Sequence, residues 1–395
     1  MTIVEEALGA STVPRSWDVR PLWAIARERK GNLNTGMRET NLLSLSFGNV
    51  IRKDIDATGG LLPASFEGYQ IVNQGDLILR LTDLQNDKRS LRSGLCGEQG
   101  IITSAYLCLV PTGIDPRYFA YLMRAYDVAK VLYPLGGGLR QSLTFEDIRM
   151  LPILVPPVEE QRRIAEFLDD QVVRISELST ELDRSLALFE ERRDSAVSEA
   201  MPVGSALVPL SAMARVIDTE HKTAPAVEAG GHWIVGTSAI RLGDIDYSKA
   251  YETDAETYHE WTRRGRPEVG DILLTREAPV GAVAIVKSAS RPIAIGQRVV
   301  LLKPSTALEP EFLLAFLLSP ELDRVIKFEN QGSLHPHLNM RSISRLRIPR
   351  IPLDRQVEVA KQVSRILTQS RDAIEAVAAQ LALLGERRRA VITAA

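Results

Sequence analysis

The sequence VPPVEEQ at residues 155–161 returns as IPLDRQ at residues 351–356, with the final glutamines 195 positions apart. In each copy, proline is followed by one or two acidic residues and a glutamine, and a long run with little glycine or proline begins. Proline and acidic side chains are typical of the first turn of a helix. The stretch therefore predicts the start of a long helix, and its return predicts a second one.

Other stretches return at the same interval. ERR at residues 191–193 returns at 386–388, GDLIL at 75–79 returns as GDILL at 270–274, and the DP pair at 115–116 returns, 194 positions on, as EP at 309–310. A constant offset near half of 395 residues predicts a duplicated unit that covers the chain. Such a duplication suggests an object that reads something twice.

Each copy has two parts. A block rich in glycine, proline and short β-branched runs is followed by a helical segment. Strands are predicted at 75–80, 270–276 and 299–302, and short helices begin at 115 and 309. The predicted domains are a first block at 1–158, a first spacer helix at 159–200, a second block at 201–353 and a second spacer helix at 354–395. The fold class is α+β or α/β, with an internal pseudo-two-fold repeat.

The two helical segments carry apolar residues at steps of three and four, which is one face of a helix. We expect the two helices to pair through this face, antiparallel, in the manner of a coiled coil. Charge permits either direction, but an antiparallel pair needs no long return from the second block. About 36 helical residues at ~1.5 Å each make a spacer of roughly 54 Å. The pairing positions are Ile164, Leu168, Ile175, Leu178, Leu182, Phe189, Val363, Leu367, Ile374, Val377, Leu381 and Leu384.

Composition narrows the class of protein. A formal net charge of −2 argues against a polycation that coats nucleic acid, although the acidic excess is concentrated in residues 159–200. Apolar stretches are too short to span a bilayer, and residues 1–13 do not have the pattern of a signal peptide. Only Cys96 and Cys108 occur, without metal spacing, which suits a reducing compartment. We therefore expect a cytoplasmic protein.

In this order and twice over, the motifs resemble the specificity (S) subunit of Type I restriction–modification systems, over essentially the whole chain. The resemblance implies two target recognition domains, each reading one half of a bipartite DNA target, and helices that set the gap and dock two methyltransferase (M) subunits. It implies S-adenosylmethionine on the M subunits, which methylate adenine, ATP and Mg on restriction (R) subunits, and no cofactor on this chain. The helix starts differ, with Ile351 in place of Pro156 and Arg355 in place of Glu160, which affects the equivalence of the two docking surfaces.

Candidate DNA contacts are basic and amide side chains on turns, because Arg matches guanine, and Asn or Gln matches adenine, while Lys holds phosphates. An ordinary solvated charge is the alternative at each position, and the segment 80–92 is the strongest candidate. The first block offers Arg80, Gln85, Asn86, Lys88, Arg89, Arg92, Arg140 and Gln141. The second block offers Arg263, Arg264, Arg266, Arg276, Lys287, Arg298, His335, His337, Asn339 and Arg341.

Three other functions have less support in the sequence. His335 and His337 lack a partnering Cys or carboxylate cluster, so a metal site is disfavoured, and contact with base edges or with loop backbone remains open. No phosphate loop or methyltransferase motif is found, and the glycines at 136–138 do not follow the dinucleotide pattern, so we predict a non-catalytic subunit. A helical-rod scaffold whose blocks bind protein partners is the alternative to DNA recognition.

Overall fold

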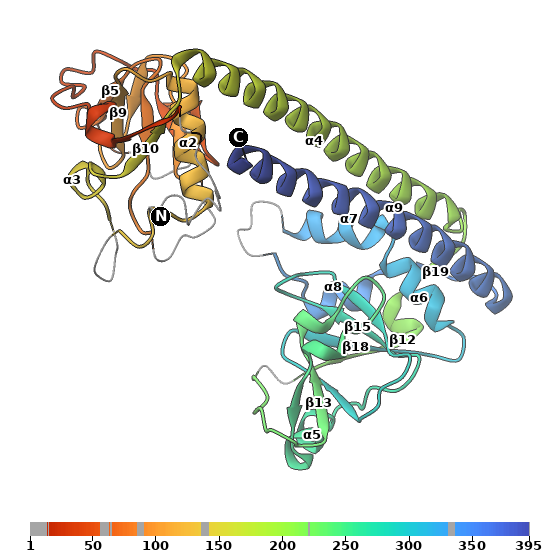
Figure 1. Cartoon of the computed structure of the whole chain (residues 1–395). Helices are drawn as coiled ribbons and strands as arrows, with labels where there is room; N and C mark the ends of the chain where they lie inside the picture. The colour runs from red at the N-terminus through yellow and green to blue at the C-terminus, as the bar shows by residue number, and fades with distance from the viewer. Residues whose placement is uncertain are drawn as a thin grey trace. The chain divides into compact units, whose positions relative to one another are not determined.

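Figure 1 shows a computed structural model of the chain. It describes residues 14–394 except 15, 56–62, 64, 85–90, 136–141, 220–221 and 331–335. The chain divides into two compact units, and each takes in part of both long helices. The first unit comprises Met1–Leu182 with Ala379–Ala395, and the second comprises Asp183–Ala378. The predicted boundaries at the helix starts stay a proposal.

Each unit is built around a four-stranded antiparallel sheet of the same strand order. In the first unit the order is β2-β9-β6-β7, with β2 Ala26–Glu28, β9 Leu107–Pro111, β6 Leu77–Leu79 and β7 Ser93–Leu95. In the second unit it is β12-β18-β15-β16, with β12 Ala214–Asp218, β18 Val299–Pro304, β15 Ile272–Thr275 and β16 Val283–Ile285. The Gly-Asp strands β6 and β15 are buried along their length, as their unbroken apolar runs predict. The internal repeat is confirmed.

Smaller sheets join the beginning and end of each block. β1 (Asp18–Pro21) pairs antiparallel with β10 (Pro152–Val155), and β11 (Leu207–Pro209) pairs in the same way with β19 (Arg347–Pro349). A 3-10 turn follows the first strand of each pair, at Leu22–Ala24 and Leu210–Ala212. These pairings hold the two ends of a block together just before its long helix.

The blocks differ in their outer layers. The first adds the hairpin β3 (Leu43–Ser46) and β4 (Asn49–Arg52), and the pair β5 (Gln70–Val72) and β8 (Gly100–Ile102). The second adds the sheet β14-β13-β17, at Tyr251–Thr253, His232–Val235 and Ile293–Ile295, in which β13 and β17 are parallel. It also has the 3-10 turns Thr237–Ala239 and Tyr247–Lys249. The repeat thus includes the central sheet and the terminal strand pair of each block, but not these outer strands.

Each unit also has short helices, of which α2 and α6 pack on the central sheets. The first unit has α2 (Pro116–Val128) and α3 (Phe145–Ile148). The second has α5 (Ala255–Trp261), α6 (Pro310–Leu317), α7 (Pro320–Glu329) and α8 (Met340–Arg345). Proline stands in the first turn of both α2 and α6, as predicted, and the carboxylate of Asp115 caps α2 by accepting from the backbone N–H of Arg117 at 2.9 Å. Phe119 of α2 and Phe312 of α6 are fully buried in the cores of their units.

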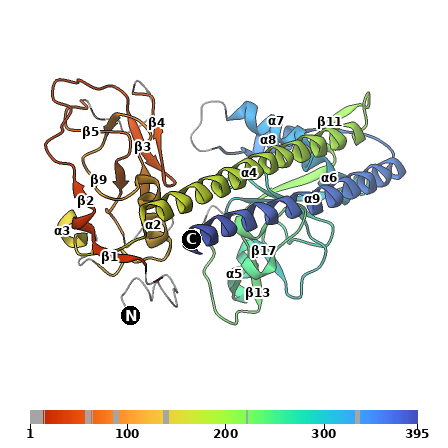
Figure 2. The same ribbon diagram turned by 45° about the horizontal axis from the view of Figure 1, so that its top comes forward.

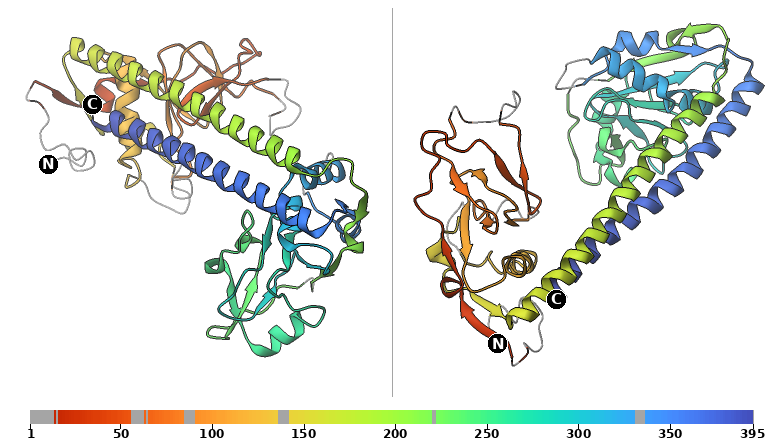
Figure 3. Two further views of the ribbon diagram at one scale, coloured as in Figure 1. Left: turned by 90° about the vertical axis from the view of Figure 1, so that its right-hand side faces the viewer. Right: turned by 90° about the horizontal axis from the view of Figure 1, so that it is seen from above.

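The two long helices are α4 (Val158–Ala200) and α9 (Leu353–Ala394). In the first unit the beginning of α4 lies beside the end of α9, and in the second unit the end of α4 lies beside the beginning of α9 (Figures 1, 2 and 3). The two helices therefore run antiparallel, as predicted.

A glutamine anchors each long helix to its own block. The Oε1 atom of Gln161 accepts from the backbone N–H of Asp115 at 2.7 Å, and that of Gln356 accepts from the N–H of Glu309 at 2.8 Å. Their Nε2 atoms donate to the carbonyls of Pro156 and Ile351. The repeated glutamine thus joins the end of its block to the start of the helix, and it does so twice.

The apolar stripe of the helices is largely turned inward. Of the pairing positions, Leu168, Ile175, Val363 and Val377 are buried, and the others are half-buried except Leu178. The prediction that Leu178 is a pairing position is wrong, because its side chain is 48% exposed. It lies roughly 60° around the helix from Ile175, whereas Leu182 lies within about 20° of Ile175. Ser179 takes the half-buried place instead, and its hydroxyl donates to the Ile175 carbonyl at 2.8 Å.

Within the described part of the chain, none of the helices has the length and apolar character needed to cross a membrane.

Candidate nucleic-acid interface

Two segments that are far apart in sequence meet at the same end of the central sheet in both units. In the first unit the backbone N–H of Leu143 donates to the carbonyl of Leu81 at 2.9 Å. In the second unit the N–H of Leu338 donates to the carbonyl of Arg276 at 3.0 Å. Both pairs are related by the 195-residue offset. The segment after the Gly-Asp strand and the segment that follows the closing loop (residues 136–141 and 331–335, outside the described residues) therefore share one edge, which we call the loop edge.

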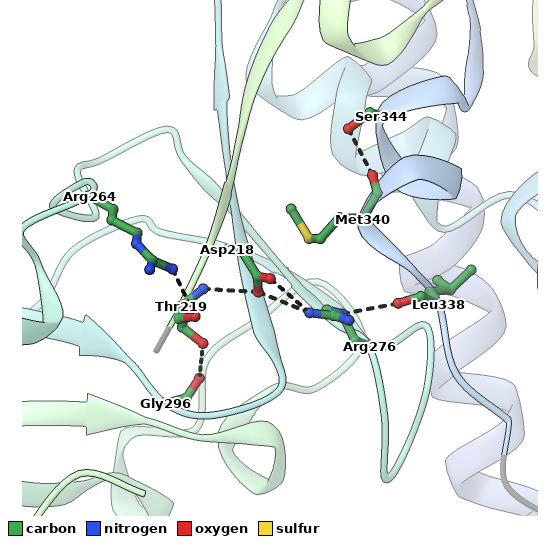
Figure 4. Close-up of polar contacts among 8 residues, drawn as sticks. All are labelled: Asp218, Thr219, Arg264, Arg276, Gly296, Leu338, Met340 and Ser344. Atoms are coloured by element: carbon green, nitrogen blue, oxygen red, sulfur yellow. Dashed lines mark hydrogen bonds and ion pairs between the residues drawn. The ribbon is translucent and has the colours of Figure 1, made fainter. Parts of the chain in front are cut away.

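Arg276 organises the loop edge of the second unit (Figure 4). Its Nη1 donates to both carboxylate oxygens of Asp218 at 3.0 Å, and its Nε donates to the carbonyl of Leu338 at 3.0 Å. The side chains of Arg276 and Asp218 are largely enclosed, so the ion pair is held in a region where charge–charge attraction is stronger than in water. This guanidinium joins the ends of β12 and β15 to the segment that follows the closing loop.

Further segments converge on the same place. The carbonyl of Thr219 accepts from Nη1 of Arg264 at 3.3 Å, and the hydroxyl of Thr219 donates to the carbonyl of Gly296 at 3.4 Å (Figure 4). The backbone N–H of Arg276 donates to the carbonyl of Arg298 at 2.8 Å. The exposed Arg298 side chain forms an ion pair with Glu277, at 3.2 Å between Nε and Oε2. Three predicted arginines, Arg264, Arg276 and Arg298, are thus brought together.

Arg92 has a different environment from the one predicted. Its side chain is fully buried, with 0% exposed, and its Nη1 donates to the carbonyls of Arg80 and Thr82 at 3.2 and 2.7 Å. Its Nη2 donates to the carbonyl of Asp83 at 3.2 Å. An enclosed guanidinium cannot reach DNA without leaving these partners, so we correct its assignment from DNA contact to support of the loop that follows β6. Arg80 is half-buried at the start of that loop.

A buried carboxylate stands behind Arg92. The backbone N–H of Arg92 donates to Oδ2 of Asp127 at 2.6 Å. Burial raises the pKa of Asp127, and this hydrogen bond opposes the shift. The contact ties the loop after β6 to helix α2. Sequence reasoning missed Asp127, as it missed Asp218, because only basic and amide residues were considered as candidates.

Several candidates lie outside the described residues. They belong to the loop after β6 or to one of the two closing loops. Their assignment to DNA contact stays a prediction. They are Gln85, Asn86, Lys88, Arg89, Arg140, Gln141 and His335.

Other candidates lie away from the Arg276 cluster. Lys287 follows β16, which runs antiparallel to β15, so it is at the opposite end of the sheet from Arg276, and its Nζ pairs with Asp244 at 2.5 Å. Arg266 lies over the ring of Tyr258, at 5.5 Å from Cζ to the ring centroid. Arg263 is exposed in the same segment.

The segment after the closing loop carries the remaining candidates. The backbone N–H of His337 donates to Oδ1 of Asn330 at 2.8 Å, and its ring is exposed. Asn339 caps α8 by accepting from the N–H of Ser342 at 2.9 Å, so part of its hydrogen-bonding capacity is used within the chain. Arg341 is exposed and lines a cavity of about 590 Å³ together with Arg345 and Arg347. Arg345 and Arg347 were not among the predicted DNA contacts, although both follow Arg341 within six residues in the sequence.

No group of three or more His, Cys, Asp or Glu side chains is arranged to hold a metal ion within the ranges that the structure covers. The chemistry that the loop edge does offer is hydrogen-bond donation by guanidinium groups. Such donors suit phosphate oxygens and the acceptor edges of guanine.

This fold and these sites define a class of protein. The Type I restriction modification DNA specificity domain matches residues 101–186 and 243–381, which is more than half of the chain. The chain belongs to this family, that of the specificity subunits of Type I restriction–modification systems.

Particular relatives are distant in sequence. The putative type I restriction enzyme MjaX specificity subunit of Methanocaldococcus jannaschii is 22% identical over 286 residues, or 64% of this chain. The match spans 61% of that relative, less than two thirds of its length. A chain in a solved structure on complex assembly and conformational transition of the type I R-M system is 19% identical, with a TM-score of 0.68, covering 96% of this chain and 97% of that one. This likeness supports the fold.

A second solved structure is the HsdS subunit from Thermoanaerobacter tengcongensis, with 17% identity, a TM-score of 0.47 and 97% of both chains covered.

Proposed function

We propose that each block of this specificity subunit reads one half of a bipartite double-stranded DNA target. The observation that carries the proposal is the repeated loop edge: two sheets of one strand order, each with the same two segments joined by the same backbone hydrogen bond. Loops that vary on a constant scaffold are where binding specificity is usually found. The two blocks then recognise different sequences with one architecture.

Within this proposal the arginines have two roles. Arg298 and Arg264 on the loop edge are exposed, and we propose that they contact bases or phosphates in exchange for their present partners, Glu277 and the carbonyl of Thr219. Arg276 and Arg92 hold the loops in shape through carbonyl and carboxylate partners. The candidates in the loops outside the described residues remain part of the proposal as base contacts.

The partners in the proposal are double-stranded DNA, two M subunits and R subunits. The M subunits bind S-adenosylmethionine and methylate adenine, and the R subunits use ATP and Mg. The domains are 1–158 and 201–353 for recognition, with 159–200 and 354–395 as the spacer helices that set the gap and dock the M subunits. A helical-rod scaffold that binds only proteins is not favoured, because the matched family is one of DNA specificity domains.

A block exchange tests the division of labour. Residues 1–158 are replaced by the first block of another family member, and the chain is expressed with its M partner in a host without other methylation. Sequencing of the methylated DNA is expected to show a change in one half of the target, with the other half and the gap unchanged. The unaltered chain and the M subunit alone are the controls. A change in both halves would contradict the proposal.

A further inference from the structure

A cavity of about 520 Å³ opens in the second unit where α6 and α7 face α9 and the end of α4. We call it the groove. Its apolar floor includes Leu314 of α6, Leu318 directly after α6, and Val363 and Leu367 of α9. At its rim Leu242 is 72% exposed. Exposed leucine beside an apolar cavity is typical of a surface that another molecule covers.

The repeat shows what occupies the corresponding place in the first unit. With the 194-residue offset of the short helices, Tyr121 and Arg124 of α2 correspond to Ala315 and Leu318 of α6. With the 195-residue offset of the long helices, Asp169 of α4 corresponds to Ser364 of α9. The matching contacts made by the two anchoring glutamines justify this alignment.

In the first unit large polar side chains close this face. The hydroxyl of Tyr121 donates to Oδ1 of Asp169 at 2.8 Å, and Nη1 of Arg117 donates to Oδ2 of the same carboxylate at 3.0 Å. Arg124 donates to the carbonyl of Ser93 at 2.6 Å. Burial, and then repulsion by Arg388 of α9, lower the pKa of Arg124 to about 10. Arg117 and Tyr121 thus join α2 to α4, and Arg124 joins α2 to β7.

In the second unit the equivalents are too small to do this. Alanine stands in place of tyrosine at residue 315, leucine in place of arginine at 318, and serine in place of aspartate at 364. All three residues line the groove. The groove is therefore the consequence of specific substitutions within an otherwise repeated interface, and a molecule from outside could replace the missing side chains.

The charge of the groove indicates what kind of molecule binds there. Three cationic side chains line it, and two of them are already paired: Arg193 with Asp194 at 2.8 Å and Lys287 with Asp244 at 2.5 Å. Arg371 is the third. Against them stand six carboxylates, so the lining has a formal charge of −3; they are Glu190, Asp194, Asp244, Glu311, Asp323 and Glu375. An acidic rim around an apolar floor is complementary to a basic, amphipathic polypeptide segment.

We propose that the groove receives a basic amphipathic segment of a partner polypeptide. Apolar side chains of this segment cover Leu314 and Leu318, and its Lys or Arg side chains pair with Glu311 and Glu375. The inference rests on the proposed function, in which the partner at the long helices is a methyltransferase subunit. It assigns part of that contact to the recognition block itself, through α6, and not to the long helices alone.

Two variants of the full chain test the inference. Ala315→Tyr with Ser364→Asp rebuilds the Tyr121–Asp169 contact of the first unit and closes the groove. Glu375→Lys reverses one rim charge, and Asp372→Lys is its matched control, because Asp372 is exposed on the same helix and does not line the groove. The purified methyltransferase subunit is titrated against each labelled chain, and thermal unfolding by circular dichroism checks that each variant is folded.

Closure of the groove and Glu375→Lys are each expected to raise the Kd of a methyltransferase subunit at least about tenfold, and Asp372→Lys to leave it unchanged. The effect of Glu375→Lys should shrink as salt is raised. Binding of both variants with the Kd of the unaltered chain would overturn the groove inference and leave the proposed function standing. Absence of binding by the unaltered chain would instead contradict the proposed function. Glu375→Lys keeps the test decisive even where the closed variant fails to fold, because residue 375 is exposed.

Discussion

The buried carboxylate at the start of each Gly-Asp strand is neutralised in two different ways. Asp76 accepts from Nε and Nη2 of Arg29, the residue that follows β2, both at 2.7 Å. Asp271 pairs instead with Nζ of Lys303 on β18, at 2.6 Å. Leu77 pairs with Leu109, and the equivalent Ile272 pairs with Leu302, so Lys303 stands in the place of the apolar Val110. The repeat has kept the carboxylate and moved the cation to β18, because what folding requires is a buried charge with a partner.

Asp76→Ala should therefore destabilise the first unit strongly. Only 3% of the Asp76 side chain is exposed, and removal of one member of a buried pair leaves Arg29 uncompensated, at a cost of about 3–5 kcal/mol. Thermal unfolding of the full chain, followed by circular dichroism, measures the shift. The matched control is Glu268→Ala, which removes a solvent-exposed partner of Lys303 and should leave the unfolding midpoint nearly unchanged. Equal shifts for the two variants would count against this account.

Arg276→Ala should weaken recognition of the second half of the target alone. Loss of the bonds to Asp218 and to the Leu338 carbonyl frees the segment that follows the closing loop. We expect a loss of discrimination of about 1–3 kcal/mol, the range of one good side-chain contact to a base. Methylation of oligonucleotides altered in either half measures it. Arg324→Ala, which breaks an exposed pair within α7, is the control, and a loss of discrimination in the first half as well would refute the assignment.

At the level of elements, the long helices are stabilised by a narrow inward face. Apolar steps of three and four identified that face, and burial follows it through Leu168, Ile175 and Val363. Their starts are set by proline, acidic side chains and the anchoring glutamines. Tertiary packing decides the edges of the face, which is why Leu178 is exposed although its spacing fitted the pattern.

Ile175→Ala and Leu178→Ala form a matched pair on α4. Ile175 is 5% exposed, so its truncation should cost about 2–5 kcal/mol of stability in the first unit. Leu178→Ala removes a side chain that is nearly half exposed, so the loss of stability should be markedly smaller. Thermal unfolding midpoints of the full chain compare the two. A larger loss for Leu178→Ala would mean that the inward face has been assigned to the wrong side of the helix.

At the level of the whole molecule, the duplication offers two recognition blocks on one chain with two antiparallel helices. Corresponding sheets, anchoring glutamines and loop edges show that the copies share one scaffold. The groove and the outer strands show that the copies have diverged where partners and DNA are proposed to bind. Divergence on a shared scaffold agrees with the proposal that the two blocks recognise different half-sites.

Insertion of seven residues in each long helix, two turns that preserve the inward face, tests the spacer role. Each insertion adds about 10 Å of helix, or about three base pairs at 3.4 Å per step. Sequencing of methylated DNA should show a gap longer by about this amount and both halves unchanged. A variant with seven residues replaced in place, at constant length, is the control. An unchanged gap in a folded, active variant would refute the spacer role.

Which features the sequence could predict depends on how far apart along the chain the interacting residues are. The repeat, the central strands and the antiparallel helices could be predicted, because periodicity, prolines and turn residues act over a few positions. The burial of Arg92 could not, since its partners include Tyr133, 41 residues away, and an isolated Arg in a polar segment looks exposed. The same holds for Arg276 and Asp218, which are 58 residues apart.

The sequence by itself therefore determined that this chain is a duplicated unit with paired helices. Each local pattern occurs twice at a constant offset, so the second copy supports the interpretation of the first. Only the tertiary structure decided which arginines support loops, that the segments after the Gly-Asp strands meet Leu143 and Leu338, and that one repeated interface is filled while the other is open. These outcomes depend on side-chain volumes and charges that meet across long sequence separations, where no local pattern reports them.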